Sequence, residues 1–596
     1  MNTNIRQMSA KVGVVGMILF SLASLTSCND DNVIGENPYA GGREPISVKL
    51  LDKNPNPASA AASEEVTFYA AGLAKYCHPE ENRYDFDFYI SDEKAQVLNA
   101  NDSLVTIRVP ENVSSGLAYI VVENQIFFGP NFKILGSVSV DEGFSYYKTN
   151  GKLTGPIGGN IYDLLPWSGN NELLSRFYLA GNFRKSSDLK NDDYFRGGLA
   201  MVTNKDGQSK WDVSYFKASN CIYLSYGTDN NNADDGVLVS PKGNGLAYMR
   251  DEAKNPSVLI YGFFNKFEDG RYNNPPYNNL NLLKNDMSMA TTNRNLANDE
   301  GGASTVSLPT FTGGTSGEVV RAWGTTKGQI VAVGNFTLHR QIDYENSLWS
   351  SSLSRVEAEY KETYQPTVTR MDKTGVCDTL FRRGAQYTGV MGTIIDACQL
   401  DNDDMVLVGE FNAFDGTQVS NIVKLKEDGN IDEAFMAMIG AGADGPINQI
   451  SYFKATDREY IVMTGQFHTF NGQECDGLVV LNADGSFDPD FKSLGFEGGY
   501  PNFAKIVDIN GRPKMIVSGT FGKYNGIVRR GFLMLELTGE SIQGFNVSGQ
   551  FSGRIYDAAY SLTSDNMNGV LLVGAFSYFD GQPANNVVML RVELDQ

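Results

Sequence analysis

The stretch Leu407–Gly416, LVGEFNAFDG, returns three times before the end of the chain, at Met463–Gly472, Val517–Gly526 and Val573–Gly581. The glycines of the shared Gly-x-Phe core are spaced 56, 54 and 55 residues apart. A fixed period of this length is typical of a stacked or radial array rather than of a single globular core. In each copy an apolar segment runs into Gly-x-Phe and then into an Asp-Gly or Asn-Gly turn. Such turns favour a β-hairpin, because these residues tolerate a positive φ.

Weaker copies of the core precede the four clear ones, at Leu179–Phe183, Ile260–Phe264 and Ala332–Phe336. The anchor glycines are then Gly181, Gly262, Gly334, Gly409, Gly465, Gly519 and Gly574. Some copies are followed by a second turn phrase, such as LKEDGNIDEAF at Leu425–Phe435. Together the phrases resemble the delta-60 repeat, a β-propeller-type repeat of secreted bacterial proteins. The resemblance implies about four short strands per unit and seven blades over residues 137–596, with six or eight blades as the neighbouring alternatives.

The end of the repeat region predicts how the propeller closes. The chain stops just after the third strand expected for its last unit, so that blade lacks a fourth strand. The segment Val138–Thr149 precedes the first unit and contains the strand-like stretch Phe144–Tyr147. We expect this stretch to complete the last blade and to remove an open sheet edge, which would otherwise invite aggregation.

Residues 44–136 show a different pattern of short strands. VTFYAAGL at Val66–Leu73 and VTIRVPENVSSGLAYIVV at Val105–Val122 resemble the immunoglobulin-like IPT/TIG domain. In that family the second phrase is a strand, a Pro-led turn and a returning strand. The resemblance implies a β-sandwich that serves as a spacer or docking module, to which we assign no chemistry. The predicted fold class is therefore all-β, an immunoglobulin-like sandwich followed by a β-propeller.

The first 43 residues differ in composition from the rest of the chain. Two basic residues precede the apolar run Val12–Leu25, which is too short and wrongly flanked for a membrane span. The run ends in Leu-Thr-Ser-Cys, which resembles a bacterial lipobox and implies a signal peptide over residues 1–27 and acylation of Cys28. The alternative is a plain secretory signal with a chance cysteine. Residues 28–43 predict an acidic flexible tether, and Asn29–Asn32 within it resemble the acidic export tag of Bacteroidetes surface lipoproteins.

The chain is acidic, with a formal net charge of −21, which argues against nucleic acid or anionic lipid headgroups as partners. The membrane is therefore expected to be contacted only through the lipid anchor. The three histidines stand in unrelated contexts, and the six cysteines show no C-x-x-C pair. The sequence thus indicates no metal site, no cofactor and no histidine-based triad. Neutral sugars, peptides and divalent cations remain compatible with this composition.

Three aspartates lie close together in a second turn phrase, at Asp484, Asp488 and Asp490. An EF-type calcium loop needs more oxygen ligands at alternating positions and a closing bidentate Glu, and the phrase has neither. We therefore interpret these residues as turn aspartates that accept hydrogen bonds from backbone amides.

Polar residues recur at one position of the predicted first strands. The fourth residue after the opening glycine of a unit is often polar, as at Asp163, Arg321, Asp396, Gln449 and Asp557. Because the first strand of a blade lines the central channel, we expect these side chains to form a ring at one mouth of it. The ring would satisfy strand ends and ordered waters, bind a cation or polar ligand, or supply paired carboxylates about 5 to 10 Å apart for glycoside hydrolysis. The sequence leaves these three roles open.

The early repeat units carry long insertions, within residues 217–236, 271–317 and 337–364, which we predict to be loops. Long loops on a rigid scaffold are often functional. Their aromatic rings would stack on sugar rings while Asn and Asp side chains bind hydroxyl groups; alternatively, the aromatics pack the loops onto the blades. The candidate ligand-binding residues are Trp349, Tyr344, Tyr272 and Tyr277 in the insertions and Trp167 at a strand end. Trp349 is foremost, because it lies outside the repeat strands.

The architecture and the signal resemble Bacteroidetes surface proteins that accompany nutrient-import systems. The resemblance implies an outer-membrane lipoprotein that faces the cell exterior and captures a glycan, or another polymeric nutrient, without cleaving it. The expected partners are the glycan, an outer-membrane transporter and the transporter's SusD-like lipoprotein. Two alternatives stay open. One is a propeller glycoside hydrolase or lyase that uses the channel carboxylates; the other is a protein-interaction module that docks on a transporter or host protein.

Overall fold

The computed structural model describes residues 46–144, 148–149, 152–153, 159–167, 176–184, 197–204, 211–214, 222–223, 225–226, 237–238, 242–267, 278–382 and 388–594. Strands dominate these residues, which contain one α-helix, α2 (Glu433–Ile439). The predicted all-β class is confirmed. The sheets below all belong to one compact unit, Lys49–Gln596. No helix within the described ranges is long and apolar enough to cross a membrane.

The N-terminal strands form an eight-stranded sheet. Its order is β1 (Lys49–Leu50), β3 (Glu65–Ala71), β8 (Leu104–Arg108), β7 (Glu93–Ala100), β6 (Asp87–Ile90), β9 (Gly116–Val122), β10 (Gln125–Leu135) and β2 (Ser59–Ala61). Because β1 also contacts β10, the sheet wraps around a core in which the rings of Phe68 and Phe88 lie 4.8 Å apart. The predicted N-terminal β-domain is therefore present, whereas its assignment to the IPT/TIG family stays a prediction.

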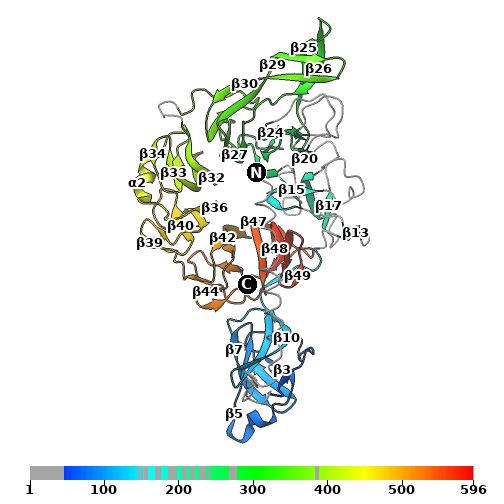
Figure 1. The fold of residues 1–596 in the computed structure, drawn as a ribbon, viewed down its shortest axis with the longest axis vertical. Coiled ribbons are helices and arrows are strands. Elements are labelled where there is room, and N and C mark those ends of the chain that lie inside the picture. The colour runs from blue at the N-terminus through cyan, green and yellow to red at the C-terminus, as the bar shows by residue number, and fades with distance from the viewer. Residues whose placement is uncertain are drawn as a thin grey trace, which may run out of the picture. The chain divides into compact units, whose positions relative to one another are not determined.

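Seven sheets among the described residues share one pattern. Their first strands are β14 (Ile161–Pro166), β21 (Lys242–Tyr248), β27 (Glu318–Gly324), β32 (Val390–Gln399), β36 (Ile447–Lys454), β42 (Pro501–Ile509) and β47 (Phe551–Leu562). Each first strand contacts the first strand of the next sheet, and β47 contacts β14, so the sheets follow one another around a ring (Figure 1). This cyclic order confirms a β-propeller. The blade number of the whole chain stays a prediction.

The second and third strands of each sheet follow by antiparallel pairing. The second strands are β15 (Arg176–Arg184), β22 (Val258–Phe263), β28 (Ile330–Asn335), β33 (Met405–Phe414), β37 (Glu459–Gly465), β43 (Arg512–Gly519) and β48 (Asn568–Phe579). The third strands are β16 (Gly197–Asn204), β24 (Leu280–Leu283), β31 (Val368–Met371), β35 (Ile422–Leu425), β40 (Leu478–Asn482), β46 (Phe532–Leu535) and β50 (Val587–Val592). In most sheets the chain then turns back and makes one isolated bridge, such as Leu425–Ile431, instead of the predicted fourth strand. An Asp-Gly turn separates the two bridge residues in Leu425–Ile431 and Leu481–Phe487.

Smaller elements connect or extend these sheets. They are η1 (Ala74–Tyr76), β4 (Cys77–His78), η2 (Pro79–Glu81), β5 (Arg83–Tyr84), β12 (Lys148–Thr149), β13 (Lys152–Leu153), β17 (Trp211–Ser214), β18 (Ile222–Tyr223), β19 (Ser225–Tyr226), β20 (Val237–Leu238), β23 (Lys266–Phe267), β34 (Thr417–Gln418), β38 (Thr469–Phe470), β39 (Gln473–Glu474), β41 (Phe496–Glu497), β44 (Lys523–Tyr524), β45 (Ile527–Val528) and β49 (Gln582–Pro583). Four of them, β38, β39, β44 and β45, form the hairpins that flank the repeated Asn-Gly turns.

The anchor glycines lie where two strands of a sheet approach too closely for a side chain. A Cβ at Gly409 would lie 2.1 Å from the carbonyl oxygen of Thr393, and one at Gly574 would lie 2.0 Å from that of Arg554. The other anchors meet a carbonyl in or just before their own first strand in the same way. The phenylalanine two residues later is buried in every sheet: Phe183, Phe264, Phe336, Phe411, Phe467, Phe521 and Phe576. Gly-x-Phe therefore recurs because each blade needs a close backbone contact followed by a core side chain.

Asparagine side chains join three of the sheets to their neighbours. The Oδ1 atom of Asn586 accepts a hydrogen bond from the Phe576 N–H at 2.7 Å, and its Nδ2 donates to the Gly159 carbonyl at 2.7 Å. Asn279 and Asn421 bond in the same way to their own sheet and to the next one. All three adopt a positive φ, which asparagine tolerates better than most residues.

The last sheet is completed by β11 (Val138–Val140), in which Val138 pairs with Val592 of β50. The closing strand therefore comes from the predicted segment, but from its start rather than from Phe144–Tyr147. Phe144 lies outside any strand, because its side chain packs with Ile161 and other residues in the core between the last and first sheets. Residues 145–147 lie outside the described residues.

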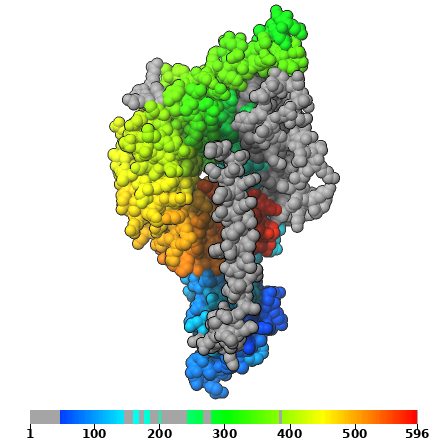
Figure 2. All heavy atoms as spheres, in the orientation of Figure 1, coloured from blue at the N-terminus to red at the C-terminus, as the bar shows by residue number. Residues whose placement is uncertain are grey.

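Two of the predicted insertion loops are strands instead. β26 (Ala303–Pro309), β25 (Thr291–Asn298), β29 (Leu338–Ser350) and β30 (Arg355–Tyr364) form a four-stranded sheet, which we call the insertion sheet. It has a small apolar core of its own around Leu296, Leu308 and Ile342. In the space-filling view the insertion sheet lies within the green region at the top, and the fourth to sixth propeller sheets form a continuous yellow-to-orange surface (Figure 2). The loop prediction failed because cross-strand pairing buries the alternating apolar residues of these segments.

Candidate functional site

Each first strand contains a β-bulge directly after the residue that pairs with the anchor glycine. In all seven sheets the pairing with the second strand shifts by one residue at the same place. The bulge residues are Tyr162, Asn244, Val320, Ile395, Asn448, Asn502 and Tyr556. A bulge leaves its residue without a ladder partner and re-aims its side chain. All of them except Asn502 line one cavity. Because they come from first strands around the ring, this cavity lies in the central channel, and we call it the channel cavity.

The channel cavity has a volume of about 390 Å³, which is within the usual size of small-molecule sites, about 300 to 1,000 Å³. Its walls combine two tyrosines, three cations, two carboxylates and several amides. Besides the bulge residues, the lining side chains include Lys242, Glu318, Arg321, Asn335, Asp396, Gln449, Phe503 and Arg554. A few placed polar groups beside aromatic faces are what a site for a hydroxylated ligand requires.

Two tyrosines from the last and first sheets form one wall. The ring centroids of Tyr162 and Tyr556 lie 4.9 Å apart, with an angle of 69° between the ring planes. The guanidinium carbon of Arg554 lies 5.0 Å from the Tyr556 centroid, and Lys242 Nζ lies 5.4 Å from the Tyr162 centroid. Burial raises the pKa of Tyr556, so its phenol stays protonated and able to donate a hydrogen bond at neutral pH. The wall is thus a pair of aromatic rings flanked by two cations.

Glu318 organises the next part of the wall. Its Oε1 atom accepts hydrogen bonds from Lys242 Nζ and from Asn244 Nδ2, both at 2.7 Å. The Asn244 amide also donates to the carbonyl of Val319 at 2.8 Å. Charge-assisted contacts of this kind hold side chains in place before a ligand arrives.

Four of the five predicted ring residues tie neighbouring blades together. Each accepts a hydrogen bond from a backbone N–H on the first strand of the next sheet. The acceptor–donor pairs are Asp163–Leu246 at 2.7 Å, Asp396–Ile450 at 3.0 Å, Gln449–Ala504 at 3.0 Å and Asp557–Leu164 at 3.3 Å. The last pair joins the final sheet to the first. We call this set of contacts the belt, and it corresponds to the structural role that the sequence left open.

Cations complete the belt. Arg321, the fifth predicted ring residue, donates from Nε to Asp396 Oδ1 at 2.6 Å, and Lys505 Nζ lies 2.6 Å from Asp557 Oδ1. Asp163 has no such cation in direct contact among the described residues. Burial, and next the neighbouring charge of Asp557, raise the pKa of Asp163 well above its usual range. Asp163 is therefore the belt carboxyl that tends to keep its proton.

Only some of the predicted ring residues line the channel cavity. Arg321, Asp396 and Gln449 line it, whereas Asp163 and Asp557 do not. The residues that sequence reasoning missed are the bulge residues, one position earlier, together with Lys242, Glu318 and Arg554. Regular strand alternation would place neighbouring residues on opposite faces, but a bulge brings two consecutive side chains to the same side. The opening glycine marks the position, since the bulge residue follows three places after it in five sheets.

The predicted aromatic residues do not gather at one place. Trp349 lies on β29, half-buried against the core of the insertion sheet, and Tyr344 is buried in that core, with the guanidinium carbon of Arg294 4.8 Å from its ring. Trp167 packs against another core cluster, and the guanidinium carbon of Arg176 lies 4.4 Å from its ring. Trp349 and Tyr344 thus pack within the insertion sheet itself, and Trp167 packs on a core cluster of the propeller. Tyr272 and Tyr277 lie outside the described residues.

Two of the three turn aspartates, Asp484 and Asp488, accept hydrogen bonds from backbone amides as the sequence predicts, whereas the Asp490 carboxylate pairs with Arg458. Asp484 Oδ1 accepts a hydrogen bond from the Ser486 N–H at 2.9 Å, and Asp488 Oδ1 accepts one from the Asp490 N–H at 2.9 Å. No group of three or more His, Cys, Asp and Glu side chains suited to a metal ion occurs within the described ranges.

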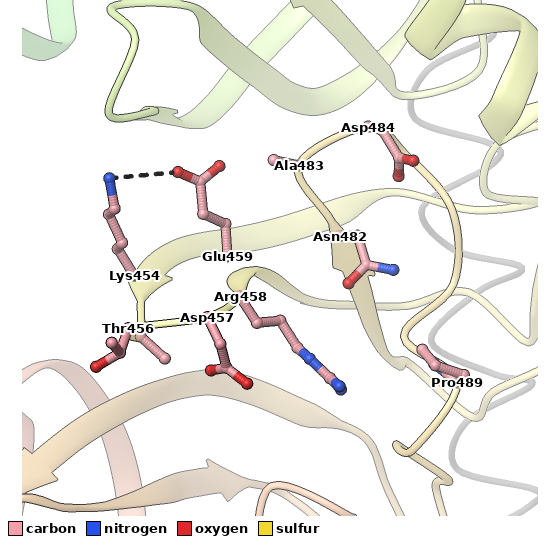
Figure 3. Close-up of a pocket in the computed structure, with 10 residues that line it drawn as sticks. Lys454, Thr456, Asp457, Arg458, Glu459, Asn482, Ala483, Asp484 and Pro489 are labelled. Carbon is pink, nitrogen blue, oxygen red and sulfur yellow. Dashed lines mark ion pairs between the residues drawn. The ribbon is translucent and has the colours of Figure 1, made fainter.

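A second hollow lies beside these turns, between the Lys454–Glu459 turn and the Asn482–Asp484 segment (Figure 3). Its charges largely satisfy one another. Lys454 Nζ lies 3.8 Å from Glu459 Oε1, and Arg458 donates to Asp490 at 2.6 Å from its place at the rim. No aromatic side chain among the described residues lines it, and its two cations, Lys454 and Arg458, are both paired with carboxylates. The channel cavity is therefore the stronger candidate for a binding site.

Comparison with known proteins supports the two-part architecture. The model of a domain of unknown function, DUF5008, matches residues 24–130, and the model of a second such domain, the DUF5122 beta-propeller, matches residues 402–435 and 461–491. No curated protein matches the chain.

Solved structures give only distant likenesses. An auxiliary nutrient binding protein from Bacteroides thetaiotaomicron VPI-5482 is 9% identical, with 91% of this chain and 97% of that chain covered and a TM-score of 0.29. One from Bacteroides ovatus ATCC 8483 is 10% identical, with 92% and 98% covered and a TM-score of 0.24. The WD40 beta propeller domain of Doa1 is 10% identical, with 76% and 96% covered and a TM-score of 0.33. Residues 24–130 of this chain thus match a DUF5008 domain, and parts of its fourth and fifth propeller sheets match a DUF5122 β-propeller.

Proposed function

We propose that this protein is a non-catalytic, cell-surface binding protein that captures a glycan in the channel cavity for an outer-membrane uptake system. The observation that carries the proposal is the composition of that cavity. The Tyr162–Tyr556 wall offers flat apolar faces for a sugar ring, and the surrounding amides and charged groups offer hydrogen bonds to hydroxyl groups. The site therefore moves from the insertion aromatics, where the sequence placed it, to the channel.

The N-terminal sequence supports the proposed location. Acylation at Cys28 would anchor the chain in the outer membrane, and residues 28–43 would act as a tether that lets the propeller face the cell exterior. An anchored receptor of this kind needs a transporter and its partner lipoprotein to receive the captured glycan.

The belt geometry supports binding rather than hydrolysis. A glycosidase needs two carboxyl groups free to exchange protons with the substrate. Asp163 and Asp557 lie outside the cavity lining, and the oxygens of Asp396 already accept hydrogen bonds from Arg321 and from two backbone N–H groups. The three aspartates thus have a structural task that proton transfer would disturb.

Calorimetric titration tests the proposal. The soluble chain from residue 28 onward, with Cys28 replaced, is titrated with a panel of dietary and host polysaccharides, and the products are assayed for new reducing ends. We expect heat without cleavage, at least tenfold weaker binding in Tyr556→Ala, and unchanged binding in Trp349→Ala. Cleavage would overturn the non-catalytic assignment. The absence of both heat and cleavage across the panel would favour a protein-interaction module. Loss of binding in Trp349→Ala but not in Tyr556→Ala would place the site on the insertion sheet.

A further inference from the structure

The charges around the channel cavity do not cancel. Lys242 is paired with Glu318 at 2.7 Å, and Arg321 is paired with Asp396 at 2.6 Å. Arg554 also lines the cavity, yet it has no carboxylate partner among the described residues. The cavity therefore carries one uncompensated positive charge, although the chain as a whole carries a formal net charge of −21.

The Arg554 guanidinium is also short of hydrogen-bond acceptors. Its Nη2 atom donates to the carbonyl of Asn448 at 3.3 Å, which is a long contact. Its Nε atom is shielded from solvent and has no hydrogen-bond partner. Arginine keeps its charge under all ordinary conditions and offers five N–H donors in a fixed fork. A shielded atom is also closed to a ligand, so an acceptor that enters the cavity would bind the two Nη atoms. Among the described residues, the one hydrogen bond of these two atoms is the long contact to Asn448.

The neighbours of Arg554 limit what that acceptor is attached to. The guanidinium carbon lies 5.0 Å from the centroid of Tyr556, whose ring is 4.9 Å from that of Tyr162. A sugar ring stacked on the tyrosine wall would place its substituents beside the guanidinium. A planar fork of this kind matches a carboxylate or a sulfate with two parallel hydrogen bonds, whereas a hydroxyl group fills only one of them.

We propose that Arg554 makes the channel cavity selective for acidic glycans, in which a carboxylate or sulfate group on the sugar binds the Arg554 guanidinium while the ring lies against Tyr556 and Tyr162. This inference rests on the proposed glycan-binding function and narrows its ligand class. It differs from the expectation drawn from the acidic composition, because a local unpaired cation inside a cavity outweighs the more distant, screened surface charge.

Matched sugar pairs test the selectivity without altering the protein. D-glucuronate is compared with D-glucose, D-galacturonate with D-galactose, and glucose 6-sulfate with glucose, by calorimetry on the soluble chain from residue 28 onward. We expect at least one acidic member to bind tenfold or more tightly than its neutral partner. The carboxylate and sulfate arms identify which anion the site takes. Equal binding within every pair would overturn the inference and leave glycan capture intact, whereas no binding by any sugar or by the polysaccharide panel would overturn both.

Variants locate the selectivity. Arg554→Gln should weaken the binding of the preferred acidic sugar by about ten- to a hundredfold, because it removes a charge-assisted contact. It should change the neutral partner by less than threefold. Arg554→Lys keeps the charge but not the fork, so we expect an intermediate loss. Arg355→Gln, on the insertion sheet, removes the same charge away from the channel and serves as the matched control. Retained acid selectivity in folded Arg554→Gln, or equal loss in Arg355→Gln, would refute the assignment, and the wild-type sugar pairs decide the question if Arg554→Gln fails to fold.

Discussion

Replacement of Asp396 by alanine tests whether the belt holds the blades together. The Asp396 carboxylate accepts hydrogen bonds from Arg321 Nε at 2.6 Å and from the N–H groups of Ala397 at 2.9 Å and Ile450 at 3.0 Å. Its side chain is 6% exposed and that of Arg321 is 26% exposed. Alanine would therefore leave a largely enclosed cation and two buried N–H groups without their acceptor.

The expected loss follows from these contacts. Removing one partner of a buried ion pair costs about 3–5 kcal/mol, because the remaining charge stays buried without compensation. Since Arg321 keeps part of its surface open to the cavity, we place the loss in the free energy of unfolding at the lower end, about 3 kcal/mol. The double variant Arg321→Met, Asp396→Ala removes the stranded cation as well. It should regain part of the loss, with a coupling energy of about 1–2 kcal/mol.

Urea-induced unfolding, followed by circular dichroism, measures Asp396→Ala, the single variant Arg321→Met and the double variant against the wild type. Asp490→Ala is the control, because Asp490 pairs with Arg458 at 2.6 Å but is 62% exposed. Such a surface pair contributes about 1 kcal/mol or less. An Asp396→Ala midpoint equal to that of the wild type would refute the structural role of the belt. If the loss in the free energy of unfolding of the double variant equals the sum of the losses of the two single variants, the ion-pair argument is refuted.

Three further changes test other parts of the fold. Gly409→Ala should lower the thermal midpoint, because its Cβ would lie 2.1 Å from the carbonyl oxygen of Thr393; an unchanged midpoint would contradict the close-contact explanation of the anchor glycines. Asn586→Ala removes an acceptor and a donor between the last and the first sheet. It should lower the free energy of unfolding, measured in urea, by about 2 kcal/mol. An unchanged free energy of unfolding would contradict the role of Asn586 in joining the two sheets. Burial and the charge of Asp557 raise the pKa of Asp163, so the folded state holds a proton that the unfolded state releases, and stability falls as pH rises above about 4. Asp163→Asn should therefore lose less stability than the wild type as the pH is raised, and parallel pH profiles of the thermal midpoint would exclude this explanation.

The propeller could be predicted from the repeat because the glycine and the phenylalanine of Gly-x-Phe are both required by the backbone geometry of a blade. Each anchor glycine faces a carbonyl that leaves no room for a Cβ, and the phenylalanine two residues later is buried in the core. The Gly-x-Phe pattern therefore occurs in each of the seven sheets. The belt position was predictable for the same reason. Residues such as Asp396 and Gln449 recur four places after an opening glycine because each must reach a backbone N–H of the next sheet.

The candidate site was less predictable, because it depends on departures from regular pairing. A bulge adds one residue to each first strand, so Tyr162 and Tyr556 face the channel beside belt residues that simple alternation would place on the other side. The insertion sheet was missed because its strands pair with one another and not with the repeat, so no periodic signal marks them. Trp349 lies in one of these strands, where cross-strand pairing places it against an apolar core.

A crystal structure of the soluble chain with a bound glycan from the calorimetric panel tests the central claim most directly. The account predicts ligand density in the channel cavity, with a sugar ring against Tyr162 and Tyr556 and an anionic group at Arg554. Ligand density on the insertion sheet or on the N-terminal sheet, with the channel cavity empty, would contradict it.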